Sequence, residues 1–476
     1  MTRDTRDQRC VIVAGASGFI GSALSDVFDD DDYDLIGLSR NPEAAVAWSD
    51  GYHWRQCDLF SRKQTFEAMK GADVAIYLVH SMLPSADLSQ GTFADMDVIC
   101  ADNFARAAAH HGVEQIVYVS ALLPRTASKS TWRRGEITHV LGSYDTEVTT
   151  LRAGFVIGPG GAATDMIFGL VERLPVMLLP KWTSSKVSPI ARRDLVELIR
   201  FVIDHKANFP GTFEVGGAGV TTYRLMLATV ADILGLERRL FRVPVVTPTL
   251  SARWISTVTG QPHSIVWPLV ERFRHDLLPR ENRLQNAAGQ TPTPLRRSLQ
   301  LARSAPAPRP EPAEAAVAIP RHQALTGVDE FNVVRSVQRL TLPHRRTTRW
   351  VAEEYARWLP HFMGPFIRAS TYENTVRFHL GPLHRPLLTL DLDERISRTD
   401  RQLFWIRGGL LSAQHPNARL EFRRIPGRQA VLTAIHLYRP RLPWWIYRLT
   451  QAPFHHFVMH AFDRHLRRLD ARLTRT

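Results

Sequence analysis

A short apolar strand, followed at once by a glycine-rich turn, limits most strongly what this chain can fold into. Residues 10–14 read Cys-Val-Ile-Val-Ala, a run typical of a buried parallel strand, and Gly15, Gly18 and Gly21 follow it. Gly15 permits a tight turn, Gly18 lets the backbone approach a pyrophosphate, and Gly21 lets a following helix pack closely on the strand. The spacing predicts a dinucleotide-binding loop; the alternative is a glycine-rich turn without a ligand.

The residues between and after the glycines complete the expected loop. Phe19, Ile20 and Leu24 are spaced to face inward from a helix that begins in the turn. Free N–H groups at the start of that helix are expected to face the phosphates, where the helix dipole favours negative charge. We therefore expect Ser17, Phe19 and Ile20 to contact the cofactor together with the three glycines.

The end of the second expected strand bears on which dinucleotide binds. Residues 33–38 form this strand, which ends at Ser39 and Arg40. NAD-binding folds usually place an Asp or Glu about 20 residues beyond the glycines, where it binds the ribose 2′-hydroxyl. No acid stands here to repel a 2′-phosphate, and the Arg40 guanidinium is suited to bind one. The sequence favours NADP over NAD; the alternative is that Arg40 points into solvent.

Strands and helices alternate regularly over the first part of the chain. Further strands are expected at residues 53–59, 73–80, 114–120 and 149–158. This alternation predicts an α/β fold with a doubly wound parallel sheet. Asp58 and Leu59 at the third strand's exit are expected along the adenine ring. Val79 and His80 at the end of the fourth are expected on the nicotinamide side.

Several collinear segments resemble a known superfamily. They lie at residues 15–21, 77–82, 103–108, 112–120, 151–158, 171–177, 188–195 and 213–217. With them, the first 280 or so residues resemble the atypical, extended short-chain dehydrogenase/reductases, and more narrowly the NmrA-like and sugar-epimerase-like NAD(P)-binding proteins. The resemblance implies a Rossmann domain with a small substrate lobe, here over residues 8–282. It also implies an oxidoreductase or epimerase-like activity on a small molecule that the sequence does not identify.

The chain departs from that superfamily at its catalytic pair. Active members use Tyr-x-x-x-Lys on the helix after the fifth strand, with a Ser at the strand's end that holds the substrate oxygen; Ser120 matches this Ser. By register, Ser130 stands at the Tyr position and Arg134 at the Lys position. No Tyr-x-x-x-Lys occurs between residues 120 and 158, where Tyr144 is followed four residues later by a valine.

Other groups must therefore carry any chemistry. Arg134 is a fixed cation that could anchor a ribose or phosphate. His80 is the best candidate for handling the proton, because imidazole titrates near neutrality; the alternative is a hydrogen-bonded wall residue beside the cofactor. We expect either an atypical NADP-dependent enzyme that uses Ser120, His80 and Arg134, or a non-catalytic NADP(H)-binding redox sensor or assembly factor.

The second half of the chain differs in composition from the first. Residues 283–330 are rich in Pro and Ala and predict an extended tether. The remaining residues, 331–476, contain 25 Arg, no Lys and 10 acids, so they hold the whole positive excess of a chain whose net charge is +14. Strands expected at 376–380, 387–392, 403–407, 418–423 and 430–437, with a closing helix at 453–469, predict an α+β domain of the helix-grip kind.

The C-terminal region raises two ligand hypotheses. His455, His456 and His460 lie at helical spacing, but no third ligand type accompanies them, so we expect no metal site. Residues 443–448, Pro-Trp-Trp-Ile-Tyr-Arg, together with nearby Phe and Arg, could seat on an anionic membrane surface. The alternative is a packed amphipathic helix with an arginine-rich outer face. No nucleic-acid-binding module surrounds the arginines, so no nucleic-acid partner is expected.

Cysteine content and terminal sequence bear on the compartment. Three scattered cysteines suit a reducing cytoplasm, the first nine residues lack the apolar core of a signal peptide, and no run of about 20 apolar residues occurs. We expect a cytoplasmic protein, with peripheral contact at the inner membrane face as the alternative. The sequence does not predict an oligomeric state.

Overall fold

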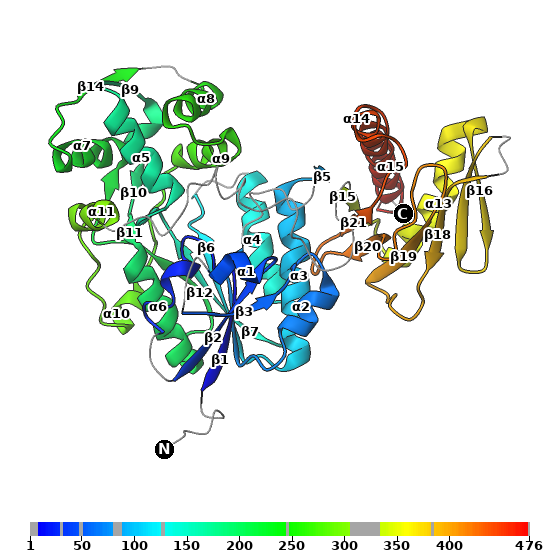
Figure 1. Ribbon diagram of the computed structural model, residues 1–476, viewed down its shortest axis with the longest axis horizontal. Coiled ribbons are helices and arrows are strands. Elements are labelled where there is room, and N and C mark those ends of the chain that lie inside the picture. Colours follow the sequence, from blue (N-terminus) through cyan, green and yellow to red (C-terminus); the bar gives the residue numbers. More distant parts are fainter. Residues whose placement is uncertain are drawn as a thin grey trace. The chain divides into compact units, whose positions relative to one another are not determined.

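The computed structural model describes the following residues: 8–28, 32–46, 51–79, 88–124, 129–243, 247–304, 334–381 and 385–474. They divide into two compact units, each with its own sheet and apolar core (Figure 1). Unit 1 takes its residues from 1–82 and 100–323, and unit 2 from 83–99 and 324–476.

Unit 1 is built on a seven-stranded sheet in the order β12-β7-β6-β4-β1-β2-β3, in which all neighbours are parallel. Its strands are β1 (Arg9–Ala14), β2 (Tyr33–Ser39), β3 (His53–Gln56), β4 (Val74–Tyr77), β6 (Gln115–Ala121), β7 (Glu147–Ala153) and β12 (Gly211–Val215). The middle of β1 is wholly buried because apolar side chains leave it on both sides, as a parallel sheet covered on both faces requires. The predicted doubly wound sheet is confirmed.

Helices cover both faces of this sheet (Figure 1). They are α1 (Pro42–Val46), α2 (Arg62–Ala68), α3 (Phe93–His111), α4 (Lys129–Leu141) and α6 (Arg192–Asp204). On one face, Phe104 of α3 packs against Tyr77 of β4, with ring centroids 5.0 Å apart. On the other face, α6 places Leu195, Ile199 and Val202 in the core that contains β1.

The region after β7 adds a smaller lobe to unit 1. Its helices are α5 (Ala162–Arg173), α7 (Tyr223–Ile233), α8 (Pro248–Thr259), α9 (His263–Phe273), α10 (Arg283–Ala287) and α11 (Leu295–Ser304). Its short strands are β8 (Val156–Ile157), β9 (Val176–Pro180), β10 (Lys186–Val187), β11 (Ile190–Ala191), β13 (Thr221–Thr222) and β14 (Arg239–Val243), and its 3-10 turns are η2 (Lys181–Ser184) and η3 (Lys206–Asn208). A separate apolar cluster holds most of the lobe together.

Two local expectations for unit 1 need correction. The predicted α-helix after the glycine turn is a single 3-10 turn, η1 (Gly21–Ala23), because the Gly21 carbonyl accepts the Leu24 N–H at 3.0 Å and the Tyr52 hydroxyl at 2.7 Å. The first part of the predicted tether, residues 283–304, folds as α10 and α11, since Leu284 and Leu299 are buried. The rest of the tether, 305–330, lies outside the described residues.

Unit 2 is built on an eight-stranded sheet in the order β16-β17-β18-β19-β20-β21-β15-β5. Its strands are β5 (Leu88–Gln90), β15 (Val334–Thr341), β16 (Ile367–Tyr372), β17 (Thr375–Leu380), β18 (Pro386–Leu392), β19 (Arg401–Gly408), β20 (Arg419–Arg424) and β21 (Ala430–Tyr438). All pairs are antiparallel except β15 with β5, which is parallel. In the sequence, β5 lies between β4 and β6 of unit 1, but it pairs with β15. Residues 83–99, which the predicted boundaries placed in the first domain, therefore group with unit 2.

Helices complete the core of unit 2. They are α13 (Thr348–Met363), followed by the 3-10 turn η4 (Gly364–Phe366), then α14 (Trp444–Leu449) and α15 (Gln451–Leu473). Phe422 of β20, Tyr355 of α13 and Phe462 of α15 meet in one aromatic cluster. The five predicted strands and the closing helix are confirmed, as is the α+β class. No helix of the described residues is long and apolar enough to cross a membrane.

Candidate functional site

The glycine turn lies where the order of the parallel sheet reverses. From β1 the chain runs to β2 and β3 on one side, while β4 and β6 lie on the other. In open α/β sheets, ligands bind at the carboxyl ends of the strands at such a switch point. The carboxyl end of β1 meets that of β4 directly, because the Leu78 N–H donates to the Ala14 carbonyl at 2.9 Å.

The first two glycines are required by the backbone around them. Gly15 has a φ of +91°, which L side chains rarely adopt, and a Cβ there would lie 3.2 Å from the Leu78 backbone. The Gly18 N–H donates to the Gly15 carbonyl at 2.9 Å, which closes the turn. A Cβ on Gly18 would lie 2.9 Å from that same carbonyl oxygen. The turn therefore leaves room for close approach of a ligand only with glycine at these positions.

The third glycine packs the following 3-10 turn against the loop. A Cβ on Gly21 would lie 2.6 Å from the Ala16 carbonyl oxygen, which is closer than van der Waals contact allows. Leu24, three residues on, is fully buried, as its predicted inward orientation requires. Ser17, Phe19 and Ile20 are half-buried in the turn. The three glycines form the close turn that their spacing predicts, and we call this turn the glycine cradle; it is followed by a 3-10 turn instead of the expected helix.

Arg192, the first residue of α6, clamps the glycine turn. Its Nη1 donates to the Phe19 carbonyl at 3.2 Å and to the Pro159 carbonyl at 3.3 Å. The guanidinium lies 5.4 Å from the centroid of the Phe19 ring. Burial lowers the pKa of Arg192 below its ordinary value, and Asp26 opposes that shift. The sequence carries no local signal for this role of Arg192, because about 170 residues separate it from the loop that it contacts.

Ser39 and Arg40 lie at the carboxyl end of β2, next to β1. The Ser39 hydroxyl donates to the Asn41 carbonyl at 2.9 Å, and the Asn41 N–H donates back to it at 3.1 Å. The Arg40 side chain is exposed, and in the described part of the chain it forms no ion pair with an acid. A cation without a nearby carboxylate suits a phosphate group at this position.

Asp58 and Leu59 form a rigid turn after β3. The Asp58 carboxylate accepts the Phe60 N–H at 3.1 Å, and its own N–H donates to the Gln64 side chain at 2.7 Å. The Leu59 carbonyl accepts the buried Asn103 amide at 2.8 Å. Both residues are half-buried at the same sheet edge as the glycine turn.

The structure describes only some of the predicted catalytic residues. Ser120 lies near the carboxyl end of β6 and is half-buried, and Val79 follows β4, so both stand at the same edge of the sheet. His80 lies outside the described residues. Arg134, like Ser130, belongs to α4, and its side chain lies outside the description.

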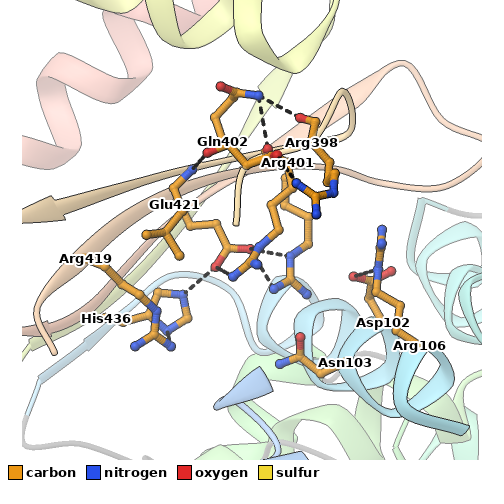
Figure 2. Close-up of polar contacts among 12 residues, drawn as sticks. Asp102, Asn103, Arg106, Arg398, Arg401, Gln402, Arg419, Glu421 and His436 are labelled. Atoms are coloured by element: carbon orange, nitrogen blue, oxygen red, sulfur yellow. Dashed lines mark hydrogen bonds and ion pairs between the residues drawn. The ribbon is translucent and has the colours of Figure 1, made fainter. Parts of the chain in front are cut away.

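Tyr144 pairs with a buried acid. Its hydroxyl donates to the Asp102 carboxylate. The other oxygen of that carboxylate accepts the Arg106 Nε at 3.0 Å, and Figure 2 shows this pair. The Arg106 guanidinium also lies 5.0 Å from the centre of the Tyr144 ring. Asp102 is buried, so this contact satisfies a charge that would be costly to leave unpaired. The phenol is thus committed to a packed network.

A second concentration of charge lies on the sheet of unit 2. Glu421 accepts two hydrogen bonds from Arg401, at 2.6 and 3.2 Å, and one from Arg423 Nε at 2.6 Å (Figure 2). His436 Nε2 lies 3.5 Å from the same carboxylate, and Arg419 Nη2 lies 3.3 Å from His436 Nδ1. The Glu421, Arg401, Arg423 and His436 side chains are all buried. We call these four residues, together with Arg419, the Glu421 cluster.

Burial and charge fix the protonation of the Glu421 cluster. Burial opposes ionisation of Glu421, but Arg423 and Arg401 outweigh it and hold the pKa of that carboxyl well below its usual range. Burial lowers the pKa of His436 to about 3, and Arg419 adds to this shift. At neutral pH the carboxylate is charged and the imidazole neutral, so the cluster offers fixed charges and no proton carrier.

The terminal histidines do not assemble a metal site. The His456 and His460 rings lie 4.2 Å apart on α15, and burial lowers the pKa of His455 to about 4. Across the residues that the structure describes, no group of three or more His, Cys, Asp or Glu side chains is arranged to hold a metal ion.

Comparison with solved structures finds similar folds at low identity. A nucleoside-diphosphate-sugar epimerase from Staphylococcus aureus has a TM-score of 0.49 at 17% identity, over 61% of this chain and 99% of that one. An NADPH-dependent quinone oxidoreductase from Escherichia coli, in complex with NADPH, has a TM-score of 0.48 at 18% identity, over 61% of this chain and 98% of that one.

Sequence comparison addresses the family directly. Auxiliary protein GraX of Staphylococcus aureus is 32% identical over 145 residues, which are 30% of this chain and 44% of GraX. The match thus spans less than half of that relative. Residues 11–128 match the model of the NAD dependent epimerase/dehydratase family. Residues 11–128 are therefore similar to the NAD dependent epimerase/dehydratase family, which agrees with the resemblance expected for this part of the chain.

Proposed function

We propose that unit 1 binds NADP(H) between the ends of β1 and β4 and acts as an atypical oxidoreductase or epimerase-like enzyme on a small molecule. The observation that carries this proposal is the glycine cradle, in which a side chain on Gly15, Gly18 or Gly21 would press on neighbouring backbone. Its place at the switch point of a parallel sheet supports a dinucleotide over a simple turn.

Charged and polar groups around the glycine cradle favour NADP(H), which carries a 2′-phosphate, over NAD(H). Arg40, exposed at the end of β2, is assigned to the 2′-phosphate. Arg192 holds the Phe19 carbonyl and so fixes the loop that would receive the pyrophosphate. Asp58 and Leu59, in the turn after β3, are assigned to the adenosine end.

The chain's own residues must then position the substrate and move a proton. NADP(H), when bound, supplies a hydride donor or acceptor. Ser120 is assigned to hold the substrate oxygen through its hydroxyl. Tyr144 is unsuited to donate the proton, because its hydroxyl already donates to Asp102. We assign the proton transfer to His80, because an unperturbed imidazole titrates near neutrality. We assign Arg134 to the ribose as a fixed cation.

A second function is favoured by one specific observation. Ser130 stands at the register position of the usual tyrosine, and the Tyr144 hydroxyl donates to Asp102. The usual tyrosine is thus replaced by a serine, which cannot serve as an activated phenol. A redox sensor or assembly factor that binds NADP(H) without turnover needs none. The relative at 32% identity carries the name of an auxiliary protein, which fits such a role.

Titration of the intact protein with NADPH and with NADH tests the proposal. Replacing Arg40 by Ala removes a charge-assisted contact worth about 1.5 to 3 kcal/mol, so the Kd for NADPH is expected to rise by about tenfold to hundredfold. The Kd for NADH is expected to stay the same. Arg253→Ala, at an exposed arginine on α8, is the matched control and should leave both values unchanged.

Four outcomes separate the possibilities. Absence of binding by either nucleotide overturns the proposal for unit 1. Equal losses for NADPH and NADH in Arg40→Ala contradict the assignment of Arg40 to the 2′-phosphate. If NADPH binds, oxidation of it by any member of a carbonyl panel supports the enzyme, whereas tight binding without turnover supports the sensor.

A further inference from the structure

Unit 2 exposes a set of large apolar side chains where α13 ends and where α14 and α15 begin. They are exposed by 40% to 72%, and we call them the apolar patch: Phe362, Phe366, Trp445, Leu449, Phe454 and Phe457. The Phe362 and Phe457 rings lie 6.0 Å apart, which joins the end of α13 to α15. α14 packs against α15, and Trp445 and Leu449 are one helical turn apart on it.

The patch does not result from loose packing of these helices. Tyr447, between Trp445 and Leu449 on α14, is buried in the core of unit 2. Val458 and Phe462 of α15 are buried there as well. Each helix is therefore seated by one face and presents large apolar side chains on another. Soluble monomers rarely expose contiguous apolar groups of this size unless the surface binds something.

The charge around the apolar patch has one sign. Residues 439–462 contain no Asp or Glu, and Arg441 and Arg448 are exposed among them. Arg464 and Arg468 of α15 are exposed as well, and the neighbouring acid, Asp463, pairs with Arg467. Aromatic and leucine side chains next to Arg441 and Arg448, in a stretch without acids, complement a surface that is apolar inside and anionic outside. An apolar protein partner would not require this basic surround.

We propose that the apolar patch docks on the surface of an anionic phospholipid bilayer. Trp445, Leu449 and Phe457 enter the boundary between headgroups and acyl chains, where amphipathic aromatic side chains are favoured. Arg441 and Arg448 contact the phosphates of the headgroups. This binding does not depend on the nucleotide site of unit 1.

Flotation of the intact protein with lipid vesicles tests the proposal. Vesicles of phosphatidylcholine alone are compared with vesicles in which about a third of the lipid is phosphatidylglycerol. We expect binding to the anionic vesicles at about 0.1 M salt and much weaker binding at about 1 M, where the Debye length falls to about 3 Å. Binding to neutral vesicles is expected to be weak at both.

Two double variants separate the apolar contribution from the charge. Trp445→Ser with Leu449→Ser is expected to weaken binding to anionic vesicles at least about tenfold, because two apolar side chains are lost from the interface. Arg441→Gln with Arg448→Gln is expected to weaken it by about 25-fold, about fivefold for each arginine. Leu225→Ser with Phe241→Ser, at similarly exposed positions of unit 1, is the matched control and should bind like the wild type.

Two results would contradict the bilayer proposal. If the wild type does not float with anionic vesicles, or if the apolar double variant floats as well as the wild type, the proposal is wrong. Light scattering on the same samples tests whether the apolar patch binds a second copy of the chain instead. A wild-type dimer that the apolar variant dissociates, without vesicle binding, would assign the patch to a second copy of the chain and overturn the bilayer. Circular dichroism confirms that each variant is folded.

Discussion

The two sheets of this protein place polar chemistry in different locations. In unit 1, Val11, Ile12 and Val13 of β1 are all fully buried, so neither face of this central strand has room for charge. Polar groups that act next to β1 must therefore lie at its carboxyl end, where the glycine turn lies. In unit 2, β20 alternates: Leu420 and Phe422 enter the apolar core, whereas Glu421 lies on the opposite face among arginines.

The contrast shows that buried charge and functional site need not coincide. The edge of unit 1 is marked by backbone shape, because side chains on the three glycines would meet neighbouring backbone. The Glu421 cluster is dense in charge, yet its protonation is fixed at neutral pH. We expect the cluster to act on the stability of unit 2, and the edge to act on ligand binding.

Removing the central carboxylate should have the largest effect. Glu421→Gln leaves the buried Arg401 and Arg423 without their counter-charge, which should lower the stability of unit 2 by about 3 to 5 kcal/mol. Unit 1 should be unaffected, because it has a separate core. Hydrogen exchange measured at rising denaturant, read peptide by peptide, reports the two units separately.

An exposed pair provides the control for that variant. Glu353 pairs with Arg349 at 2.9 Å, but both side chains are more than half exposed. Glu353→Gln should cost less than about 1 kcal/mol. Similar losses in the two variants would show that the Glu421 cluster is no more important than a surface ion pair.

Filling the glycine cradle should have the next largest effect, and in unit 1 alone. Gly21→Ala puts a methyl group 2.6 Å from the Ala16 carbonyl oxygen, which should cost about 1 to 3 kcal/mol and abolish nucleotide binding. Gly219→Ala is the matched control, because a Cβ there meets nothing within 4 Å. Full nucleotide affinity in Gly21→Ala would contradict the role of the cradle.

Low pH should destabilise unit 2 through histidines whose pKa values are lowered by burial. The pKa of His436 is about 3 in the folded chain and about 6.5 when unfolded, so between these values only the unfolded chain takes up the proton. Stability should therefore fall as the pH drops from about 6.5 towards about 3, by up to about 1.4 kcal/mol per pH unit for this group. His455, lowered to about 4, acts in the same direction.

His436→Gln isolates this contribution. Urea unfolding of unit 2, followed between pH 7 and pH 5, should show a shallower loss of stability in the variant than in the wild type; His455, His415 and His456, whose pKa values burial also lowers, contribute to what remains. Equal slopes would mean that His436 is not held neutral by its surroundings.

Removing the Tyr144 hydroxyl should give the smallest effect. Tyr144→Phe loses the hydrogen bond to Asp102 and should destabilise unit 1 by about 1 to 2 kcal/mol, while NADPH affinity stays the same. Tyr372→Phe, at an exposed tyrosine of β16, should change neither quantity. If Tyr144→Phe abolishes turnover while its stability is nearly normal, Tyr144 is a catalytic residue and its assignment here is wrong.

The sequence predicted best what depends on local pattern. Apolar runs and period-two alternation identified the strands of both sheets that carry a clear pattern, and glycine spacing identified the turn. β15 was missed because its arginines and glutamine make it read as polar, although most of its residues are buried. β5 was missed because only pairing with β15, far along the chain, makes it a strand.

The remaining features depend on contacts between distant residues. Arg192 reaches Phe19 across the fold, and Glu421 meets Arg401 only because β19 pairs with β20. The 3-10 turn at Gly21 depends on the Tyr52 hydroxyl, which no local propensity encodes. Such contacts become visible only once the strands are in register.

Hydrogen exchange of the intact protein with and without saturating NADPH tests the central claim most directly. If the dinucleotide binds between β1 and β4, the amides of residues 15–24 and 39–41 should exchange more slowly in its presence. NADH at the same concentration should protect the first segment more than the second. Unchanged exchange in residues 15–24 at a concentration where NADPH is bound would place the nucleotide elsewhere and contradict the account.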